Sequence, residues 1–152
     1  MLQEIIMNKV LIIPLFSWAI AQLCKIFIIL IREKRFNLSN FFISGGMPSS
    51  HSALVTALTT SVALIQGISS VSFGISIIFT FVVMYDAAGV RRSVGQQSRV
   101  LNRILQELRF RHTATELGRD LKELIGHTRF EVIIGGLLGI GIAWSWLTMT
   151  GT

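Results

Sequence analysis

The stretch Val10 to Ile31, VLIIPLFSWAIAQLCKIFIILI, is the part of the sequence that decides the fold. It holds 22 residues, and Lys25 is the one charged residue among them. A helix needs about 20 predominantly apolar residues to cross a bilayer, so this stretch predicts a transmembrane helix. A signal peptide is the alternative, but the run is too long for the apolar core of one and lacks a small-residue cleavage site.

Three further apolar stretches follow, and we expect each to form a membrane helix: Ser52 to Ile68, Ile68 to Tyr85 and Val132 to Met149. The joint between the first two of these, around Gly67, is short and uncharged, which predicts a tight hairpin. The sequence therefore predicts an all-α fold, a polytopic membrane helical bundle of about four transmembrane helices. We expect residues 1–152 to form a single domain.

The composition excludes several classes of protein. Hydrophobic residues make up 51% of the chain and charged residues 14%, and the mean hydropathy is +0.64. Soluble domains have about 25% charged residues, so an ordinary soluble enzyme and a disordered chain are both excluded. The single cysteine, Cys24, excludes an internal disulfide framework and a cysteine-rich metal site.

The basic residues are concentrated in two connections between the predicted helices. Arg32 to Ser50 and Gly89 to Arg129 together hold 12 of the 14 Lys and Arg residues. With four spans both connections lie on one side, and the positive-inside rule makes that side the cytoplasm, with both termini outside. The net charge of +6 therefore indicates contact with anionic membrane lipids and no nucleic-acid partner. We expect an integral protein of the bacterial plasma membrane whose active site faces the cytoplasm.

The longer connection, residues 89–129, has a helical periodicity of its own. Apolar residues recur at helical spacing in two segments, first Leu101, Ile104, Leu105 and Leu108, and then Leu117, Leu121, Leu124 and Ile125. This pattern predicts two amphipathic helices that lie on the membrane surface or cap the bundle. A small soluble cap packed on itself is an equally good interpretation.

Polar and ionisable residues gather at the predicted cytoplasmic end of the bundle. They are Lys25 and Arg32 on the first span, Pro48-Ser49-Ser50-His51 before the second, Asp86 after the third, and His127 and Glu131 before the fourth. Ionisable groups are costly in a membrane and indicate a functional site. Each also has a structural alternative: Lys25 reaching to the interface, Ser49 or Ser50 capping a helix, His51 starting one, Glu131 pairing with His127, and Asp86 pairing with Arg91 or Arg92.

Taken together, this set has the chemistry of a phosphate site. Two basic side chains and the backbone N–H groups of a Gly/Ser-rich helix start bind anions. Of two histidines, one can attack phosphorus while the other protonates the leaving oxygen. A carboxylate one turn away can hold the tautomer of the attacking histidine. The sequence has no carboxylate cluster typical of a metal pair and no P-loop, so we expect metal-independent chemistry without a cofactor.

The motifs at this end resemble those of the superfamily of type 2 phosphatidic acid phosphatases and vanadium haloperoxidases, in a divergent small branch. The first motif of that superfamily is Lys, six residues, then Arg-Pro. Here Lys25 and Arg32 have that spacing, and Glu33 stands at the proline position. The second motif is Pro-Ser-Gly-His, and here it is Pro48-Ser49-Ser50-His51, with Ser for Gly.

The third motif of the superfamily is Ser-Arg, five residues, His, three residues, then Asp. Here His127 and Glu131 keep the spacing with Glu for Asp, but Leu121 occupies the position of the arginine. The runs GGMPSSHSALV from Gly45 and YDAAGVRRSVGQ from Tyr85 resemble the divergent branch in particular. The resemblance implies that another cation replaces the arginine, and the candidates are Lys122, Arg91 and Arg92.

The resemblance implies a role for each matched residue. His127 would be the nucleophile that forms a phosphohistidine. Glu131 would be the carboxylate that orients it, and His51 would be the general acid. The phosphate oxygens would be held by Lys25, Arg32, Ser49 and Ser50. The bundle of the superfamily is larger than four spans, so this chain is either a trimmed version or completes itself as a homo-oligomer. The spacing Gly135-xxx-Gly139 indicates a close-packing seam.

The function that we expect is hydrolysis of a lipid phosphate or a prenyl (di)phosphate at the cytoplasmic face. Its partners would be membrane lipids, which the arginines of the surface helices gather, and the phosphorylated lipid substrate. The alternative is a catalytically inactive relative that binds an anionic lipid or a protein partner. A small transporter is less favoured, because its polar groups should recur near the midplane of the membrane.

Overall fold

The computed structural model describes residues 2–33, 46–89, 93, 96–98, 100–104, 107 and 128–151, and these residues contain helices and no strand. In chain order the elements are α1 (Leu2–Met7), α2 (Lys9–Glu33), α3 (Ser50–Gln66), α4 (Val71–Ala88) and α6 (Arg129–Thr150). Each long helix begins and ends within three residues of a predicted stretch. The all-α prediction is confirmed for the described residues.

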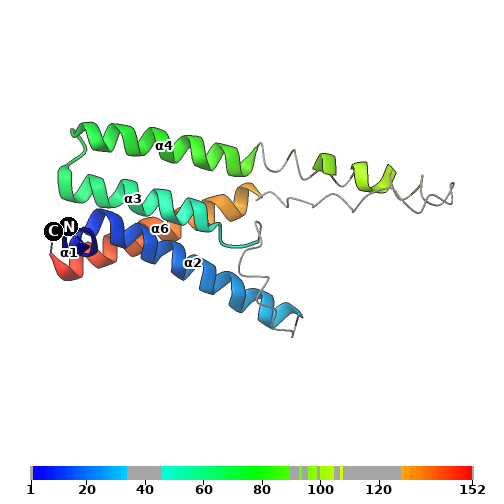
Figure 1. The fold of residues 1–152 in the computed structure, drawn as a ribbon, viewed down its shortest axis with the longest axis horizontal. Coiled ribbons are helices and arrows are strands. Elements are labelled where there is room, and N and C mark those ends of the chain that lie inside the picture. Colours follow the sequence, from blue (N-terminus) through cyan, green and yellow to red (C-terminus); the bar gives the residue numbers. More distant parts are fainter. Residues whose placement is uncertain are drawn as a thin grey trace.

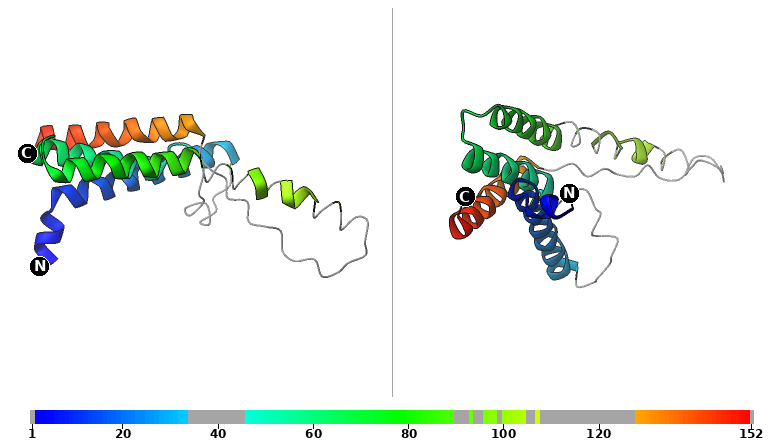
Figure 2. Two further views of the ribbon diagram at one scale, coloured as in Figure 1. Left: turned by 90° about the horizontal axis from the view of Figure 1, so that it is seen from above. Right: turned by 60° about the vertical axis from the view of Figure 1, so that its left-hand side comes forward.

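Helix α3 lies at the centre of the bundle. It packs against α2, α4 and α6, and α2 also packs against α6. Figures 1 and 2 show α4 lying along α3 on the side away from α2. The connection between α3 and α4 is the predicted tight hairpin: Gly67 has a φ of +85°, and the Ser70 side chain accepts a hydrogen bond from the Phe73 N–H at 3.2 Å. A left-handed φ favours glycine, which explains the residue at this corner.

Three described helical segments, rather than four, have the length and apolar character of a membrane span. They are Lys9–Ile31, Val71–Ala88 and Arg129–Thr150. Helix α3 has 17 residues and buries a series of hydroxyl side chains: Ser50, Ser52, Thr56, Thr59 and Ser61. The predicted count of four spans is therefore not confirmed. The physical reason is that α3 is covered by its neighbours, so it does not need the apolar surface that contact with lipid requires.

The hydroxyl groups of α3 bind it to the helices around it. The Thr56 hydroxyl donates to the Gly136 carbonyl of α6 at 2.9 Å, and the Thr59 hydroxyl lies 2.8 Å from that of Thr80 on α4. From α2, the Ser17 hydroxyl donates to the Ala53 carbonyl at 3.2 Å. Hydrogen bonds of this kind hold helices together where the hydrophobic effect between them is weak, as in lipid.

The predicted Gly-xxx-Gly seam is a contact inside the chain. A Cβ atom on Gly135 would lie 2.3 Å from the Ser49 carbonyl oxygen, and one on Gly139 would lie 2.2 Å from that of Ala53. Real Cβ atoms essentially never come that close to other atoms, so both positions require glycine. The seam thus joins α6 to α3, and self-association of the chain stays a prediction.

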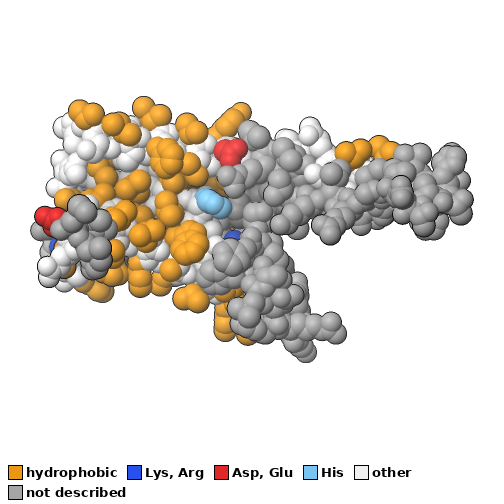
Figure 3. Space-filling model, viewed as in Figure 1, with side chains coloured by type: hydrophobic (Ala, Val, Ile, Leu, Met, Phe, Trp, Pro, Cys, Tyr) orange, Lys and Arg blue, Asp and Glu red, His pale blue; other side chains and the backbone are white. Residues whose placement is uncertain are grey.

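The two ends of the bundle differ in what they carry. Both chain termini lie at one end, where the Lys9 ammonium donates to the Gly151 carbonyl (Figure 1). At the other end, called the site end below, α2 and α4 finish and α3 and α6 start (Figures 1 and 2). Hydrophobic side chains cover the body between the ends in the view of Figure 3, and charged side chains lie toward the ends.

The described part of the longer connection fits one of the two predicted amphipathic helices. Residues 96–98 and 100–104 are helical, and the apolar side chains of Leu101 and Ile104 are exposed there. Leu105 and Leu108 lie outside the described residues, as does the second predicted helix, with Leu117, Leu121, Leu124 and Ile125.

Candidate functional site

Helix α3 starts at the site end with a serine cap. Ser49 is the N-cap residue, and its side chain accepts hydrogen bonds from the Ser52 N–H at 3.4 Å and the Ser52 hydroxyl at 3.0 Å. Ser49 and Ser50 are both fully buried. A serine in this position satisfies one of the backbone N–H groups that every helix start leaves without an intrahelical partner. The capping role weighed for Ser49 is thus present in the structure.

Helix α6 starts beside that cap, and a backbone hydrogen bond joins the two. The Ser49 N–H donates to the Glu131 carbonyl at 3.1 Å. The Gly135 backbone lies against Ser49 one turn further along α6. This close approach brings the second motif and the Glu131 position of the third motif together, although Ser49 and Glu131 are 82 positions apart in the sequence.

The start of α6 is fixed by a reciprocal capping box. The Thr128 N–H donates to a Glu131 carboxylate oxygen at 3.0 Å, and the Glu131 N–H donates to the Thr128 hydroxyl at 3.3 Å. Thr128 is not among the predicted site residues. Its capping role could have been predicted, because the sequence pattern Thr-x-x-Glu indicates such a box. Thr128 has a ψ of 155°, and α6 begins at Arg129. His127 lies outside the described residues, so its pairing with Glu131 stays a prediction.

Lys25 is a buried cation at this junction. Its side chain is 2% exposed, and its Cγ atom lies 3.7 Å from the position of a Cβ on Gly46, just before α3. The Lys25 ammonium and the Glu131 carboxylate attract each other electrostatically. A lysine that merely reaches to the interface would expose its ammonium group, so the burial of Lys25 favours a built polar site over that alternative.

The remaining described candidates, His51 and Asp86, lie at the same end of the bundle. His51 is the second residue of α3 and its side chain is exposed, while Asp86 is half-buried in the last turn of α4. Arg32 belongs to α2, but its side chain lies outside the described residues. The other candidates, Arg91, Arg92, Lys122 and His127, lie outside the described residues, as does Leu121.

The described part of the chain holds no group of three or more His, Cys, Asp and Glu side chains that could bind a metal ion. What it does hold is a buried ammonium, a buried helix start and a carboxylate within one junction of three helices. A positive side chain beside a helix N-terminus is an arrangement that attracts phosphate and other anions.

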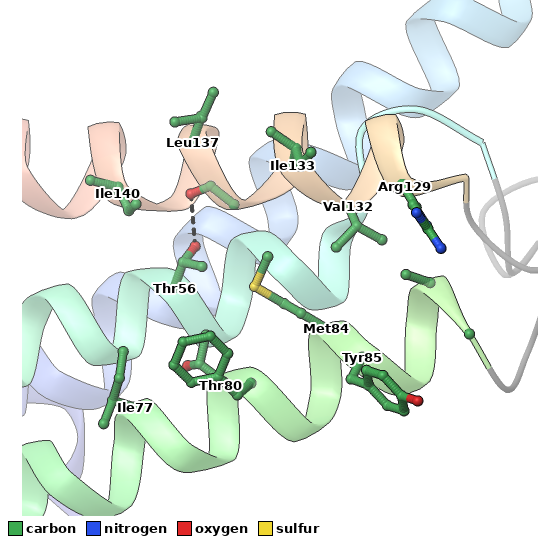
Figure 4. A pocket seen from close by; sticks show the side chains of 14 residues that line it. Thr56, Ile77, Thr80, Met84, Tyr85, Arg129, Val132, Ile133, Leu137 and Ile140 are labelled. Atoms are coloured by element: carbon green, nitrogen blue, oxygen red, sulfur yellow. Dashed lines mark hydrogen bonds between the residues drawn. The ribbon is translucent and has the colours of Figure 1, made fainter.

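An apolar groove of about 740 Å³ lies between α4 and α6, and its lining reaches the site end of the bundle (Figure 4). Its walls include Ile77, Phe81 and Met84 of α4 and Ile133 and Ile140 of α6. Arg129 and Tyr85 lie at the end of the groove nearest the site (Figure 4). The sequence does not predict this groove, because hydrophobic periodicity does not reveal the distance between two helices.

Comparison with known proteins agrees with the motif analysis. The family described as the divergent PAP2 family matches residues 6–142. The uncharacterized membrane protein YuiD of Bacillus subtilis (strain 168) is 42% identical over 146 residues, which cover 90% of this chain and 92% of that protein. No solved structure is significantly similar to the chain. The chain therefore belongs to the divergent PAP2 family, and with its apolar helices it is an integral membrane protein.

Proposed function

We propose that this member of the divergent PAP2 family is a phosphatase that hydrolyses a lipid phosphate or a prenyl (di)phosphate at the site end of its bundle. The observation that supports the proposal most is the burial of Lys25 beside the cap of α3 and the start of α6. Burying an ammonium group in a membrane protein costs free energy, and binding an anion there offsets that cost.

The proposed reaction needs two histidines and a carboxylate. A ring nitrogen of His127 attacks phosphorus, and the bond from phosphorus to the leaving oxygen breaks as His51 protonates that oxygen. The leaving oxygen is the alcohol oxygen of a phosphate monoester or the bridging oxygen of a diphosphate. His51 then takes a proton from the water that attacks the phosphohistidine, which releases inorganic phosphate and restores both histidines. Glu131 orients His127, and Lys25, Arg32 and the Ser49–Ser50 backbone bind the phosphate oxygens. Leu121 occupies the position of the arginine in the third motif, so another residue must supply that positive charge. The candidates are Lys122, Arg91 and Arg92.

An inactive relative that binds an anionic lipid is the second candidate. Two observations favour it. The Glu131 carboxylate already accepts a hydrogen bond from the Thr128 N–H, which reduces its capacity to accept one from a histidine. Leu121, at the position of the motif arginine, has no charge. Binding without turnover needs the buried cation and the helix start but no oriented nucleophile.

Phosphate release by the purified protein from a panel of lipid phosphates and prenyl diphosphates, without added metal, tests the proposal. We expect turnover of at least one substrate and its loss in His127→Ala with binding retained. Turnover that persists in His127→Ala contradicts the proposed nucleophile. Binding of the panel without phosphate release in the wild-type protein favours the second candidate instead.

The orientation in the membrane belongs to the same proposal. We propose that the site end faces the cytoplasm of a bacterial cell, because the two basic connections leave the bundle there. Reporter fusions at Asn40 and Thr113 should both report the cytoplasm, and a fusion at the C-terminus should report the outside. Opposite sides for the first two fusions would contradict this topology.

A further inference from the structure

The groove between α4 and α6 has the chemical character of hydrocarbon along most of its length. Apart from Tyr85 at the end nearest the site, the hydroxyl side chains of the groove are Thr56 and Thr80, and both form hydrogen bonds inside the bundle. Thr56 donates to carbonyls of α3 and α6, and Thr80 donates to the Val55 carbonyl at 3.0 Å. Polar groups that are satisfied internally do not attract water, so the groove offers an apolar ligand a dry surface.

The end of the groove nearest the site is polar. The Arg129 guanidinium and the Tyr85 hydroxyl lie there, and no lining residue further along is charged (Figure 4). Tyrosine and arginine are typical of the level of the lipid head groups. The groove is therefore amphipathic along its length, as a membrane lipid is, with a cationic end that suits an anionic head group.

The length of the groove corresponds to one leaflet of a bilayer. Its lining on α6 runs from Arg129 to Ile140, which is about 16 Å at 1.5 Å per residue. Half of the hydrocarbon core of a bilayer is about 15 Å. A chain whose head group lies at Arg129 would thus extend along the groove to the middle of the membrane.

The groove has a volume of about 740 Å³, which leaves room for the hydrocarbon chain of a lipid. A helix from a second copy is the competing occupant, and it is tested as a dimer. Gly136 contributes to the opening, because a side chain there would project toward Met84 and Thr56.

We propose that the groove between α4 and α6 binds one hydrocarbon chain of an anionic lipid, taken sideways from the leaflet at the site end, with Arg129 against the head group. The identity of the lipid as a phosphate-bearing one rests on the proposed function, but the binding itself requires no turnover. The groove end at Arg129 and the contact between Ser49 and Glu131 both lie at the start of α6, so one lipid can present its head group to the site.

The test is photo-crosslinking in nanodiscs of phosphatidylcholine with a small fraction of a phosphatidic acid that carries a diazirine in one acyl chain. We expect crosslinks concentrated on the residues of α4 and α6 that line the groove. Ile133→Trp, which fills the groove, should lower labelling of those residues about tenfold. Ile78→Trp is the matched control, because Ile78 is an exposed residue of α4 outside the groove, and labelling should be unchanged.

Two further variants separate binding from a general disturbance of the fold. Ile140→Trp blocks the far end of the groove, so it should reduce labelling by long-chain probes and spare short-chain ones. Arg129→Gln should lower the preference for the phosphatidic acid probe over a phosphatidylcholine probe about fivefold, as expected for one cation at the membrane surface. Lys9→Gln, which removes a charge at the opposite end of the bundle, should leave that preference unchanged.

Several outcomes would overturn the inference. They are uniform labelling of all lipid-facing helices, equal labelling in Ile133→Trp and the wild type, and protection of the groove by a second copy, seen as a disulfide-linked dimer of Ile133→Cys. Crosslinking of the groove in a protein that releases no phosphate contradicts the proposed function alone. Full turnover of long-chain substrates by Ile133→Trp contradicts the groove alone.

Discussion

The two faces of α6 show how neighbouring glycines in one helix serve opposite purposes. On one face, Gly135 and Gly139 let α6 approach the backbone of α3 so closely that no Cβ fits between them. On the other face, Gly136 lies in the open groove toward α4, where a Cβ would meet its nearest neighbour, the Met84 Cε, at 3.4 Å. The closed face thus holds the starts of α3 and α6 together, while the open face leaves room for a ligand.

The largest expected effect comes from substitutions on the closed face. Gly139→Ala places a methyl group about 2 Å from backbone and hydroxyl oxygens of α3, so the two helices must separate. We expect a loss of roughly 3 kcal/mol or more in the free energy of unfolding in detergent, or a failure to fold. Chemical or thermal unfolding followed by circular dichroism measures it.

Gly141→Ala is the matched control for that experiment. Gly141 lies in the same helix, and a Cβ there meets nothing within 4 Å. Alanine is the better helix former, so the free energy of unfolding of this variant should be unchanged or higher by up to about 1 kcal/mol. Equal stability of the Gly139 and Gly141 variants would contradict the close packing of α6 on α3.

The second effect concerns the buried cation. Lys25→Met keeps most of the side-chain volume and removes the charge, so in the proposed site it should cost about 1.5–3 kcal/mol of substrate binding and catalysis, measured as kcat/KM. Lys9→Met is the control, because Lys9 lies at the opposite end of the bundle and binds the Gly151 carbonyl. Wild-type kinetics in Lys25→Met would remove Lys25 from the phosphate site.

The smallest expected effect concerns two helix caps, of which only one lies at the site end. Thr128→Ala and Ser70→Ala each remove a capping hydroxyl and should each cost about 1 kcal/mol of stability. The first cap lies at the site end and the second at the α3–α4 hairpin. Only Thr128→Ala should also lower kcat/KM. The same loss of activity in both variants would mean that the cap of α6 has no positioning role.

Much of the fold could be predicted from the apolar stretches, because in a bilayer the backbone N–H and C=O groups must find hydrogen-bond partners within the protein, and a helix provides them. The four long helices, the hairpin at Gly67 and the end at which the polar residues meet were all predictable. The number of spans could not be predicted. Helix α3 lies in an apolar stretch, but its hydroxyl side chains form hydrogen bonds to neighbouring helices. Hydropathy measures the composition of a segment and does not reveal which residues cover it.

The candidate site was predictable in its members that carry a motif, but not in its contacts. Spacing brought Lys25, Ser49 and Glu131 into one hypothesis, and in the structure they meet at a single junction. It did not reveal that the Glu131 carboxylate binds Thr128, or that Gly135 packs on Ser49. Those contacts depend on the register between α3 and α6, which a single sequence does not specify.

The proposed function requires phosphoryl transfer to a histidine at the junction of α2, α3 and α6. Rapid acid-free quenching of the purified protein with a ³²P-labelled lipid phosphate, followed by mass spectrometry of the labelled peptide, tests it directly. The account predicts an acid-labile phosphohistidine at His127 that is absent in His127→Ala and forms more slowly in His51→Ala, least so for good leaving groups. An active protein that yields no phosphohistidine with any substrate would contradict the account.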